Sequence, residues 1–538
     1  MKEQAKPNLL DRVLGYLAPQ RAARRMRARM FMAVAGSFVG ASYTRRSLSN
    51  WFVSPASADE DTLADLETLR ARSRDMVRNT PLATGAVNTV VMNVVGTGLT
   101  LQAKPDWQAV GMTEEETDAW TAQVEREFRL WAEGTECDVT RTQNFYGLQA
   151  LVFRSALESG DTFVLLPMLA SRVSPYALRL QVVEADRVET PTGKEEIEGR
   201  KVVSGVEMDE NGAPVAYHIL RNHPGSFAGI KREYIRVPAF GEKTGRRNVL
   251  HVFERTRPGQ TRGVPYLSPV IEPLKQLDKY TESELMAAVV ASLLTVFVKS
   301  ESGDGFAPPA GDEASESEVK LGTGTIVDLA PGEDITTVAP NRPNTAFDPF
   351  TQAVLRQVGV ALGLPFEVLV KHFTASYSAA RAALLEAWRF FRLRREFLAQ
   401  AFCAPVYEAW LEEAIALGRV EAPGFFDDPA IRMAYLQAEW IGDSQGQIDP
   451  VKEVLAAEKR LEIGVSTLAD ETLWLTGKVW EDQHRQQVKE RRKREEDGLI
   501  VGGAAPGNRP SQPTSPEPSQ EQDEERGREF DWPNESKG

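Results

Sequence analysis

The sequence predicts a mainly helical protein of the α+β class with small β-rich parts. Two observations support this class. Long stretches carry apolar residues at helical spacing, while residues 162–254 change to short β-type runs bounded by turn residues. Residues 500–538 are rich in Gly, Pro, Ser, Gln and Glu, which predicts a disordered tail. A length of 538 residues allows three or four domains at roughly 150 residues each, or one elaborate assembly subunit.

Composition excludes several classes of function. The formal net charge is −14, so nothing in the overall balance favours tight binding to nucleic acid. The two cysteines, Cys137 and Cys403, lie far apart in sequence, which argues against a disulfide scaffold or a cysteine-based zinc site. Only two of the five histidines, His218 and His223, are close together. We therefore expect no metal and no cofactor.

The N-terminus resembles a signal peptide only superficially. A basic run at 21–29 precedes an apolar stretch at 31–41. The leading segment is longer than a usual signal n-region and contains Glu3 and Asp11. We therefore interpret residues 1–58 as a flexible basic arm with one short helix at 9–17.

Helices are predicted first along the chain, and then strands. The helical patterns cover 59–79, 82–95, 113–134 and 142–157. Thr113, with Glu116 three residues later, has the spacing of a capping box. Strand patterns cover 162–167, 178–183, 202–209, 214–220 and 249–254. Asn211-Gly212 separates two of these strands and predicts a hairpin, because this pair tolerates the positive φ angles of a tight turn.

Residues 267–300 are predicted to form one long helix. Ser268 and Pro269 suit its N-cap and first turn, and Pro273 implies a later start or a kink. Residues 285–298 are apolar on nearly all sides, as in a helix with several packed neighbours. This stretch is too short to cross a bilayer, which needs about 20 residues.

The remaining chain begins with an acidic module and continues as helices. Residues 301–340 hold nine acidic residues against one basic residue, Lys320, and a hairpin is predicted from 324–329 and 334–338. A helix at 348–363 follows, then a loop or broken helix at 366–377. The longest helical pattern, 376–418, should kink at Pro405. Further helices are predicted at 429–437 and 449–461, and 467–498 is predicted to form one or two helices.

No catalytic motif is present. The sequence lacks the phosphate-binding loop GxxxxGK[ST], the GxSxG elbow and HExxH. His251 and Glu254 lie on a strand pattern, where a histidine is more often a satisfied hydrogen-bond partner than a ligand. The acidic run at 301–340 is interpreted as a solvent-exposed face rather than a metal site. Basic residues on the longest helix either form ion pairs or contact phosphates or an acidic neighbouring subunit, and both interpretations stay open (Arg381, Arg389, Arg392, Arg394 and Arg395).

A set of short motifs resembles a known family. They are RNTP at 78–81, VGTG at 95–98, RPGQTRGVP at 257–265, YSAARAALLE at 377–386 and IDPVK at 448–452. Each is weak alone, but together and in this order they resemble the portal proteins of the lambda-type tailed phages, from about residue 66 to residue 499. The resemblance implies a ring, usually of twelve subunits, at one capsid vertex, through which a separate terminase motor pumps DNA.

The resemblance also implies crown, wing, stem and clip layers. Their expected ranges are 1–58 for the arm, 59–266 for the wing, 267–300 for the first stem helix, 301–347 for the clip, 348–363 for the second stem helix, 364–376 for the tunnel loop, 377–418 for the long wing helix, 419–499 for the crown and 500–538 for the tail. Expected DNA-facing residues are Lys371, His372 and Arg381. Expected stem packing residues are Val290, Leu294 and Phe297.

The partners implied by the resemblance are other copies of the chain and duplex DNA passing without sequence specificity. They also include the terminase large subunit, a head–tail adaptor, and the major capsid and scaffold proteins. The location would be the capsid vertex of the virion, after assembly in the host cytoplasm, with no membrane contact. A mostly acidic channel with few basic points would let a polyanion slide, and an acidic clip would dock partners by charge complementarity.

Two alternative functions stay open. One is an enzyme, such as a hydrolase in phage head assembly, although no motif supports it. The other is a different head–tail structural protein such as an adaptor. Adaptors are usually much shorter and lack paired long helices, so length favours the structural portal subunit without a catalytic site.

Overall fold

The computed structural model describes residues 39–41, 45–48, 50–53, 55–226, 232–292, 296–300, 333–337, 344–373, 376–447 and 449–499. The chain forms two compact units, Met1–Pro450 and Val451–Gly538. The mixture of many helices with short strands confirms the predicted α+β class. The predicted tail at 500–538, most of the predicted arm and the short helix at 9–17 lie outside the described residues.

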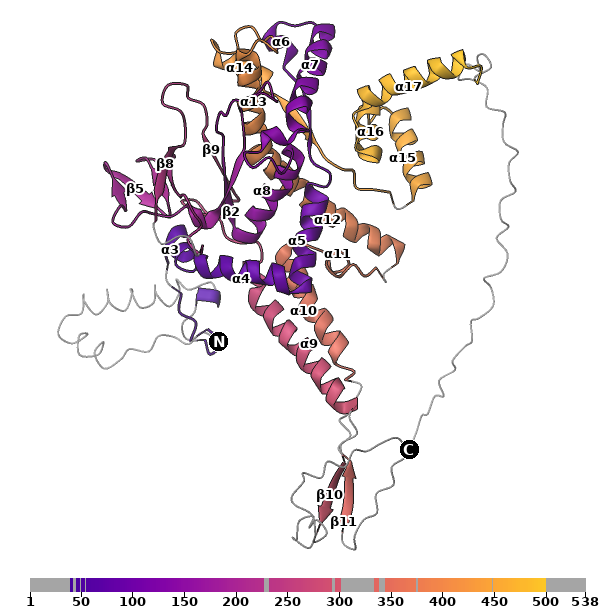
Figure 1. Cartoon of the computed structure of the whole chain (residues 1–538). Coiled ribbons are helices and arrows are strands. Elements are labelled where there is room, and N and C mark those ends of the chain that lie inside the picture. The colour runs from indigo at the N-terminus through magenta and orange to yellow at the C-terminus, as the bar shows by residue number, and fades with distance from the viewer. Residues whose placement is uncertain are drawn as a thin grey trace, which may run out of the picture. The chain divides into compact units, whose positions relative to one another are not determined.

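The described part of the first unit combines many helices with short strands (Figure 1). The helices are η1 (Val39–Ala41), α3 (Ala58–Leu63), α4 (Leu66–Asn79), α5 (Pro81–Val94), α6 (Trp107–Val110), α7 (Glu114–Ala132), η2 (Thr135–Cys137), α8 (Phe145–Ser159), η3 (Ala185–Arg187), η4 (Ser268–Val270), α9 (Ile271–Ser292), α10 (Phe347–Leu362), α11 (Phe366–Val370), α12 (Tyr377–Leu398), the π-helix η5 (Ala399–Cys403), α13 (Ala404–Ala416) and α14 (Pro429–Tyr435).

Within the described ranges the strands form four antiparallel sheets. Three central strands, β2 (Asp161–Leu165), β3 (Gln181–Glu184) and β9 (Val249–Phe253), have the order β3-β2-β9. The outer meander follows chain order and contains β4 (Glu196–Ile197), β5 (Arg200–Val203), β6 (Val206–Met208), β7 (Pro214–Leu220) and β8 (Tyr234–Pro238). Two pairs complete the set, β1 (Thr100–Ala103) with β12 (Ala438–Ile441) and β10 (Val296–Ser300) with β11 (Glu333–Thr337).

A single aromatic-rich core joins segments far apart in sequence. Phe128 of α7 packs edge-on against Phe145 of α8 and Trp410 of α13, with ring centroids 5.5 and 5.0 Å apart. Phe402 of the π-helix stacks on Phe145 at 5.6 Å. A smaller apolar cluster lies between the central strands and the meander, around Phe163 and Tyr217. The described part of the first unit therefore contains two packed centres, one mainly helical and one β-rich.

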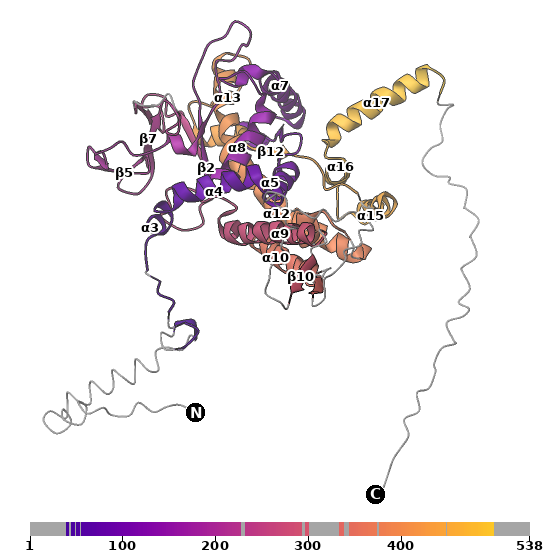
Figure 2. The same ribbon diagram turned by 60° about the horizontal axis from the view of Figure 1, so that its bottom comes forward.

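The helix pair α9 and α10 lies side by side in both Figure 1 and Figure 2. Tyr280 of α9 packs on Phe347 and Phe350 of α10, with ring centroids 5.4 and 5.3 Å apart. The first turns of α9 are anchored in the core, since Leu274 and Leu277 are buried. Pro273 falls in the first turn of α9 and does not kink it, because the first helical N–H groups have no intrahelical acceptor to lose.

Two predicted boundaries are wrong. The helix predicted over 267–300 ends at Ser292, and Val296–Ser300 is strand β10. Consecutive Val296, Phe297 and Val298 favour a pleated strand over a helix, because β-branched and aromatic side chains pack well there. The single strand predicted at 202–209 is two strands, because Ser204 and Gly205 both take positive φ angles, 45° and 84°, and turn the chain.

Other predictions hold closely. Thr113 and Glu116 form the capping box, the helix predicted at 348–363 is α10 with Gly363 as its left-handed C-cap, and the Asn211-Gly212 hairpin joins β6 to β7. The longest helical pattern is interrupted by the π-helix directly before Pro405, since proline cannot supply an N–H to a regular α-helical ladder. The predicted hairpin strand at 324–329 lies outside the described residues, and β11 pairs with β10.

The second unit is a small helical group. It contains α15 (Pro450–Glu462), α16 (Leu468–Thr476) and α17 (Trp480–Glu496). Arg460 of α15 donates through Nε and Nη2 to both carboxylate oxygens of Glu471 on α16, at 2.6 Å each. The α17 helix forms a single rod (Figure 1), and none of its residues is buried. The pattern at 467–498 is thus two helices, separated by Gly477 in the left-handed region.

Candidate functional site

The segment between α10 and α12 carries two of the predicted DNA-facing residues at one turn. Gly363 ends α10, Leu364 and Pro365 lead into the short helix α11, and Lys371 follows it with a φ of 56°. The backbone N–H groups of Lys371 and His372 both donate to the Glu367 carbonyl, which closes the helix end. A non-glycine residue in this conformation is uncommon. The turn therefore holds Lys371 and His372 adjacent to one another, and both are exposed.

Arg381 lies on the first turns of α12 rather than on the loop. Its guanidinium donates to the Tyr377 hydroxyl one helical turn earlier, at 3.4 Å. Arg381 is half-buried, whereas Tyr377 and Phe373 keep 45% and 48% of their surface exposed. The three predicted residues thus belong to two elements, Lys371 and His372 after α11 and Arg381 on α12. Two aromatic side chains of the same segment accompany them.

Other arginines of α12 are used within the protein. Arg389 pairs with Glu386 at 3.1 Å, and Arg394 pairs with Glu254. Arg395 donates to the carbonyls of Asn93 and Val94 at the end of α5, at 3.1 Å each. A cation at a helix C-terminus is favourable because the last carbonyls have no intrahelical partner. For these three residues the ion-pairing or structural interpretation is therefore correct.

The predicted stem packing residues fall at the far end of α9. Val290 lies on α9, Leu294 lies outside the described residues and Phe297 lies on strand β10, so the helical assignment of Phe297 is wrong. No side chain of the three is described. The preceding turns of the helix pair expose large apolar side chains (Leu285, Met286 and Val289 on α9, and Phe350 and Val360 on α10).

The most buried ionic centre surrounds Asp161 at the start of β2. Its carboxylate is fully buried and accepts hydrogen bonds from Arg70 of α4 at 2.7 Å and from Nε of Arg262 at 2.5 Å. His251 of β9 lies 3.1 Å from the same carboxylate. The interpretation of His251 as a satisfied strand partner is therefore confirmed. Two arginines and a histidine from three separate segments converge on one carboxylate.

Every donor of the Arg262 guanidinium has an acceptor. Two N–H groups point to Asp161, and the other three point to the carbonyls of Ala185, Val188 and Ser204, at 2.7–2.8 Å. A buried charge is tolerated only when it is paired and hydrogen-bonded in this way. Arg262 therefore ties β2 to the η3 segment before the outer meander and to the turn between β5 and β6 within it.

The charges of this centre shift its titration. Burial by itself would raise the pKa of Asp161, but the neighbouring Arg262 and Arg70 outweigh it and hold the pKa well below its usual range. Burial lowers the pKa of His251, with the hydrogen bond to Asp161 opposing the shift, and it lowers the pKa of Arg70 to about 10. Because ionised Asp161 can only accept, neutral His251 carries its proton on Nε2.

The RPGQTRGVP motif now has a structural explanation. The Gln260 side-chain oxygen accepts hydrogen bonds from the backbone N–H groups of Thr256 and Arg257, and its Nε2 donates to the Arg262 carbonyl. These bonds fix the conformation of the loop. A Cβ on Gly263 would lie 2.0 Å from the Gly160 carbonyl oxygen, so only glycine fits. The loop continues to Tyr266, whose hydroxyl donates to the Leu362 carbonyl at the end of α10. The motif therefore links the Asp161 centre to both helices of the α9–α10 pair.

The VGTG motif also has a partner. Thr97 donates to Asp443 through its backbone N–H at 3.0 Å and through its hydroxyl at 2.9 Å. A Cβ on Gly96, whose φ is 56°, would lie 1.9 Å from a carboxylate oxygen of Asp443. Arg395 donates to the Asp443 carbonyl at 3.0 Å. The segment after β12 is thus held by the end of α5 and by α12.

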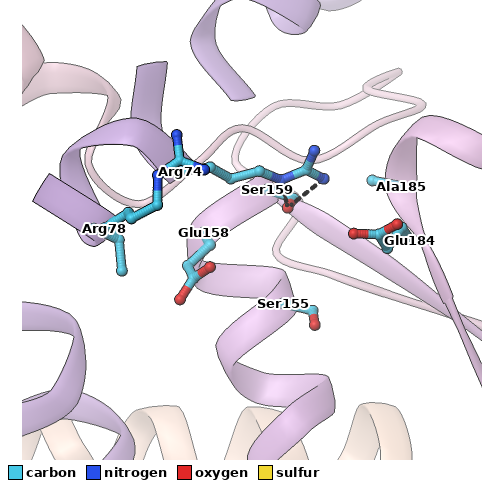
Figure 3. Close-up of a pocket in the computed structure, with 8 residues that line it drawn as sticks. Arg74, Arg78, Ser155, Glu158, Ser159, Glu184 and Ala185 are labelled. Atoms are coloured by element: carbon cyan, nitrogen blue, oxygen red, sulfur yellow. Dashed lines mark hydrogen bonds between the residues drawn. The ribbon is translucent and has the colours of Figure 1, made fainter. Parts of the chain in front are cut away.

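A cavity of about 300 Å³ lies between α4, the end of α8 and β3. Figure 3 shows Arg74 reaching toward Ser159, and Arg78 and Glu158 are among the other lining residues. Arg74 donates to the Ser159 hydroxyl at 3.1 and 2.9 Å and also pairs with Asp186. Its guanidinium is therefore already engaged, and the lining mixes charges of both signs.

Two features of the described ranges bear on other functions. In those ranges, no group of three or more His, Cys, Asp and Glu side chains is placed to hold a metal ion. Among the described helices, none is both long enough and apolar enough to cross a membrane.

Sequence reasoning missed the Asp161 centre and the Asp443 contact. The available signal was Arg262 beside Gly263 in a loop rich in Gly and Pro, since a glycine inside a loop can mark a close approach of backbone segments. Asp161, Arg70 and Asp443 themselves carry no such signal, since nothing in their local sequence marks a partner 90 or more residues away.

The described chain is mainly helical, and it combines a buried ionic centre, an exposed apolar helix pair and a basic loop. Residues 44–395 match the family model described as phage portal protein, lambda family. This match spans more than half of the chain, and the chain belongs to the lambda family of phage portal proteins.

Characterised relatives cover nearly the same length. The chain is 28% identical over 499 residues to portal protein B of Escherichia phage lambda, covering 86% of this chain and 91% of that protein. It is 28% identical over 481 residues to the portal protein of Escherichia phage N15, covering 84% and 89%. A probable portal protein of Halomonas phage phiHAP-1 is 27% identical over 425 residues, covering 77% of each.

Similar solved structures include chains from gene transfer agent particles. A chain of the native virion has a TM-score of 0.43 at 14% identity, covering 76% of this chain and 92% of that chain. A chain of the native particle neck, computed with C12 symmetry, has a TM-score of 0.39 at 13% identity, covering 77% and 98%.

Proposed function

We propose that copies of this chain assemble into a ring, usually of twelve subunits, at one vertex of a phage capsid, and that duplex DNA passes through the ring during packaging and ejection. The observation that carries the proposal is membership of the lambda portal family, with nearly the whole of two phage portal proteins matched. The proposal places the chain in the virion, after assembly in the host cytoplasm.

The exposed apolar side chains of α9 and α10 support self-association. Leu285 and Met286 are 67% and 61% exposed, and Val360 is 84% exposed. Large apolar side chains that stay exposed on neighbouring positions, as Leu285 and Met286 do, can mark an interaction site. We assign the helix pair to the stem, with Val290 and Leu294 at subunit contacts. Replacing either with Asp is expected to block ring assembly.

The basic turn after α11 supports a sparse DNA contact. Lys371 and His372 are exposed on a turn fixed by the Glu367 carbonyl, while the chain as a whole carries a net charge of −14. Each phosphate neutralised adds affinity through counterion release, so many contacts would hold DNA and few would let it slide. We assign 364–376 to the tunnel loop, with Lys371, His372 and Arg381 facing DNA without reading its sequence.

The other layers follow from the same proposal. We assign 59–266 to the wing, 301–347 to the clip, 377–418 to the long wing helix and 419–499 to the crown. The clip, with its acidic composition, would dock the terminase large subunit and then a head–tail adaptor by charge complementarity. The major capsid and scaffold proteins would contact the outside of the ring. Phe297, on β10, then belongs to the strand that leads into the clip.

The second candidate, a hydrolase in phage head assembly, is not favoured by the matched relatives, which are portal proteins. We propose that the chain performs no chemistry of its own. A hydrolysis assay with nucleotide and peptide substrates tests this directly, and an activity of the purified chain that a single substitution removes would contradict it.

Electron microscopy of the purified full-length chain tests the main proposal. We expect rings with a central channel, and class averages give the subunit number. A chain that stays monomeric under every assembly condition, including addition of scaffold and major capsid proteins, would overturn the proposal.

A further inference from the structure

One basic segment that the proposed site does not use lies in the middle of α17 in the second unit, between acidic residues at both ends of the helix (Glu481, Asp482, Glu495 and Glu496). Residues 485–494 contain six basic side chains and one acidic side chain, Glu490. This segment carries a formal charge of +5, so the rest of the chain carries −19, given the total of −14. The basic side chains therefore do not follow the general charge of the protein.

Four of the six basic residues share one face of the helix. Arg485, Lys489, Arg492 and Lys493 stand at positions i, i+4, i+7 and i+8, which at 3.6 residues per turn fall within roughly 100° of the circumference. We call these four residues the α17 stripe. Glu490, Arg491 and Arg494 point to other sides. No acidic residue interrupts the stripe between its first and last members.

The stripe is accessible and weakly engaged. None of the α17 residues is buried, and all four stripe residues are exposed. Arg485 lies 3.9 Å from Asp482 and Arg492 lies 3.4 Å from Glu496. Exposed pairs of this kind contribute at most about 1 kcal/mol and exchange readily for another anion. In the described part of the chain, Lys489 and Lys493 form no ion pair.

The shape of α17 suits a linear polyanion. Eight residues of helix span about 12 Å, and duplex DNA presents a negative charge about every 1.7 Å along its axis. A straight, exposed helix with cations along one side can therefore face several phosphates at once. It reads no bases, because phosphate contacts position a protein without specifying sequence.

We propose that the α17 stripe is a second, sequence-independent contact for duplex DNA, separate from Lys371, His372 and Arg381. The inference rests on the proposed function, because portal subunits meet duplex DNA. In a ring the stripe would repeat once per subunit, so weak contacts would add up. The alternative occupant, an acidic protein surface on a neighbouring copy, is distinguished by the experiment.

The test compares two double variants of the full-length chain in a fluorescence anisotropy titration with a labelled duplex of about 40 base pairs. Lys489→Gln with Lys493→Gln removes two stripe charges. Arg491→Gln with Arg494→Gln removes two charges from the same helix but from other faces. Glutamine is a good helix former, so both variants should keep their helical circular dichroism.

We expect the stripe variant to reduce the slope of log K against log salt by about 2, because each phosphate that is no longer neutralised lowers the slope by about 0.9. Its affinity should fall about tenfold or more at low salt, and the control variant should change both quantities by less than half as much. Equal reductions in the two variants, or no reduction in the stripe variant, would overturn the inference. A stripe variant that fails to form rings yet binds duplex normally would also overturn the inference. The stripe would then contact a neighbouring copy of the chain and not DNA.

Failure of the inference can be told apart from failure of the proposed function. If the unmodified chain forms rings that bind duplex, and the stripe variant binds duplex equally well, only the α17 contact is contradicted. The proposed portal ring then stands. Absence of rings from the unmodified chain counts against the proposed function itself, and absence of duplex binding by that chain overturns the α17 contact.

Discussion

Arg262 and Asp161 form an ion pair in which both side chains are almost completely removed from solvent, at 1% and 0% exposure, with Nε and Oδ2 2.5 Å apart. The pair joins the loop that leads into the α9–α10 helices to the first residue of the central strand β2. Because Arg262 also satisfies three backbone carbonyls, the contact fixes the position of two turns as well as a charge.

Replacing Arg262 with Met should be strongly destabilising. The change leaves Asp161 short of its closest cation and exposes three buried carbonyls to an apolar side chain. We expect a loss of about 3–5 kcal/mol in the free energy of unfolding, the usual cost of removing one partner from a buried pair. Urea denaturation followed by tryptophan fluorescence measures it.

Arg257→Met supplies the matched control. Arg257 lies in the same loop and pairs with Asp61, but both side chains are about half exposed, at 48% and 45%. Exposed pairs contribute about 0–1 kcal/mol, so the loss should be small. Similar losses in the two variants would show that burial of the Arg262 pair has no energetic importance.

Acidification should destabilise the protein through His251. Its pKa is lowered in the folded state by burial, so the unfolded chain binds the proton first as pH falls below about 6.5. Stability is therefore present above this pH and declines below it, by at most about 1.4 kcal/mol per pH unit for one proton. Asp161, whose pKa is also lowered, adds a further loss only below about pH 4.

The measurement is the difference in melting temperature between the wild-type chain and His251→Gln from about pH 8 to about pH 5. Glutamine retains an N–H that can donate to Asp161 but does not titrate, and the other histidines contribute equally to both proteins. A difference that stays constant over this range would contradict the prediction.

Substitutions of Lys371 can separate the effect of its charge from the effect of its backbone conformation. Its φ of 56° costs a non-glycine residue about 1 kcal/mol. Lys371→Gly should therefore have a higher melting temperature than Lys371→Ala, while both variants lose the same charge. If Lys371 faces DNA, the two variants should weaken duplex binding equally. An alanine variant as stable as the glycine variant would show that the left-handed turn is not maintained.

Met286→Asp tests the exposed face of α9. Met286 is 61% exposed, so a charge there should alter the stability of the monomer by no more than about 0.5 kcal/mol. Ring assembly should nevertheless be blocked, as measured by mass photometry. Ser283→Asp adds the same charge at an exposed polar position of the helix and should assemble. Normal rings from Met286→Asp would place the subunit contact elsewhere.

Local signals explain which parts of the fold could be predicted. The capping box of Thr113 and Glu116 and the turn at Asn211-Gly212 depend on contacts within a few residues. The local sequence is therefore sufficient to predict both. The α9 helix was predicted eight residues too long because its apolar pattern continues into Val296–Ser300, where pairing with the distant β11 decides the outcome. Period alone cannot distinguish a buried helix from a short buried strand.

The candidate site divides in the same way. The position of Lys371 and His372 in a loop could be predicted because they stand between two recognisable helices, and their contact with DNA stays a prediction. The Asp161 centre could not, because Arg70, Asp161, His251 and Arg262 come from four separate segments and each is unremarkable in its own. The pairing of Thr97 with Asp443 spans 346 residues, and no local pattern anticipates such a contact.

Strand β1 cannot pair with β12 until most of the chain has been synthesised. Thr100 and Ile441 are 341 residues apart and neighbours in this sheet. At about 5–20 residues per second on the ribosome, β1 waits for tens of seconds before its partner exists. During that interval its edge is open to other chains. A chain truncated before Ala438 would keep that edge unpaired permanently, so early termination should yield aggregation-prone protein rather than a smaller functional subunit.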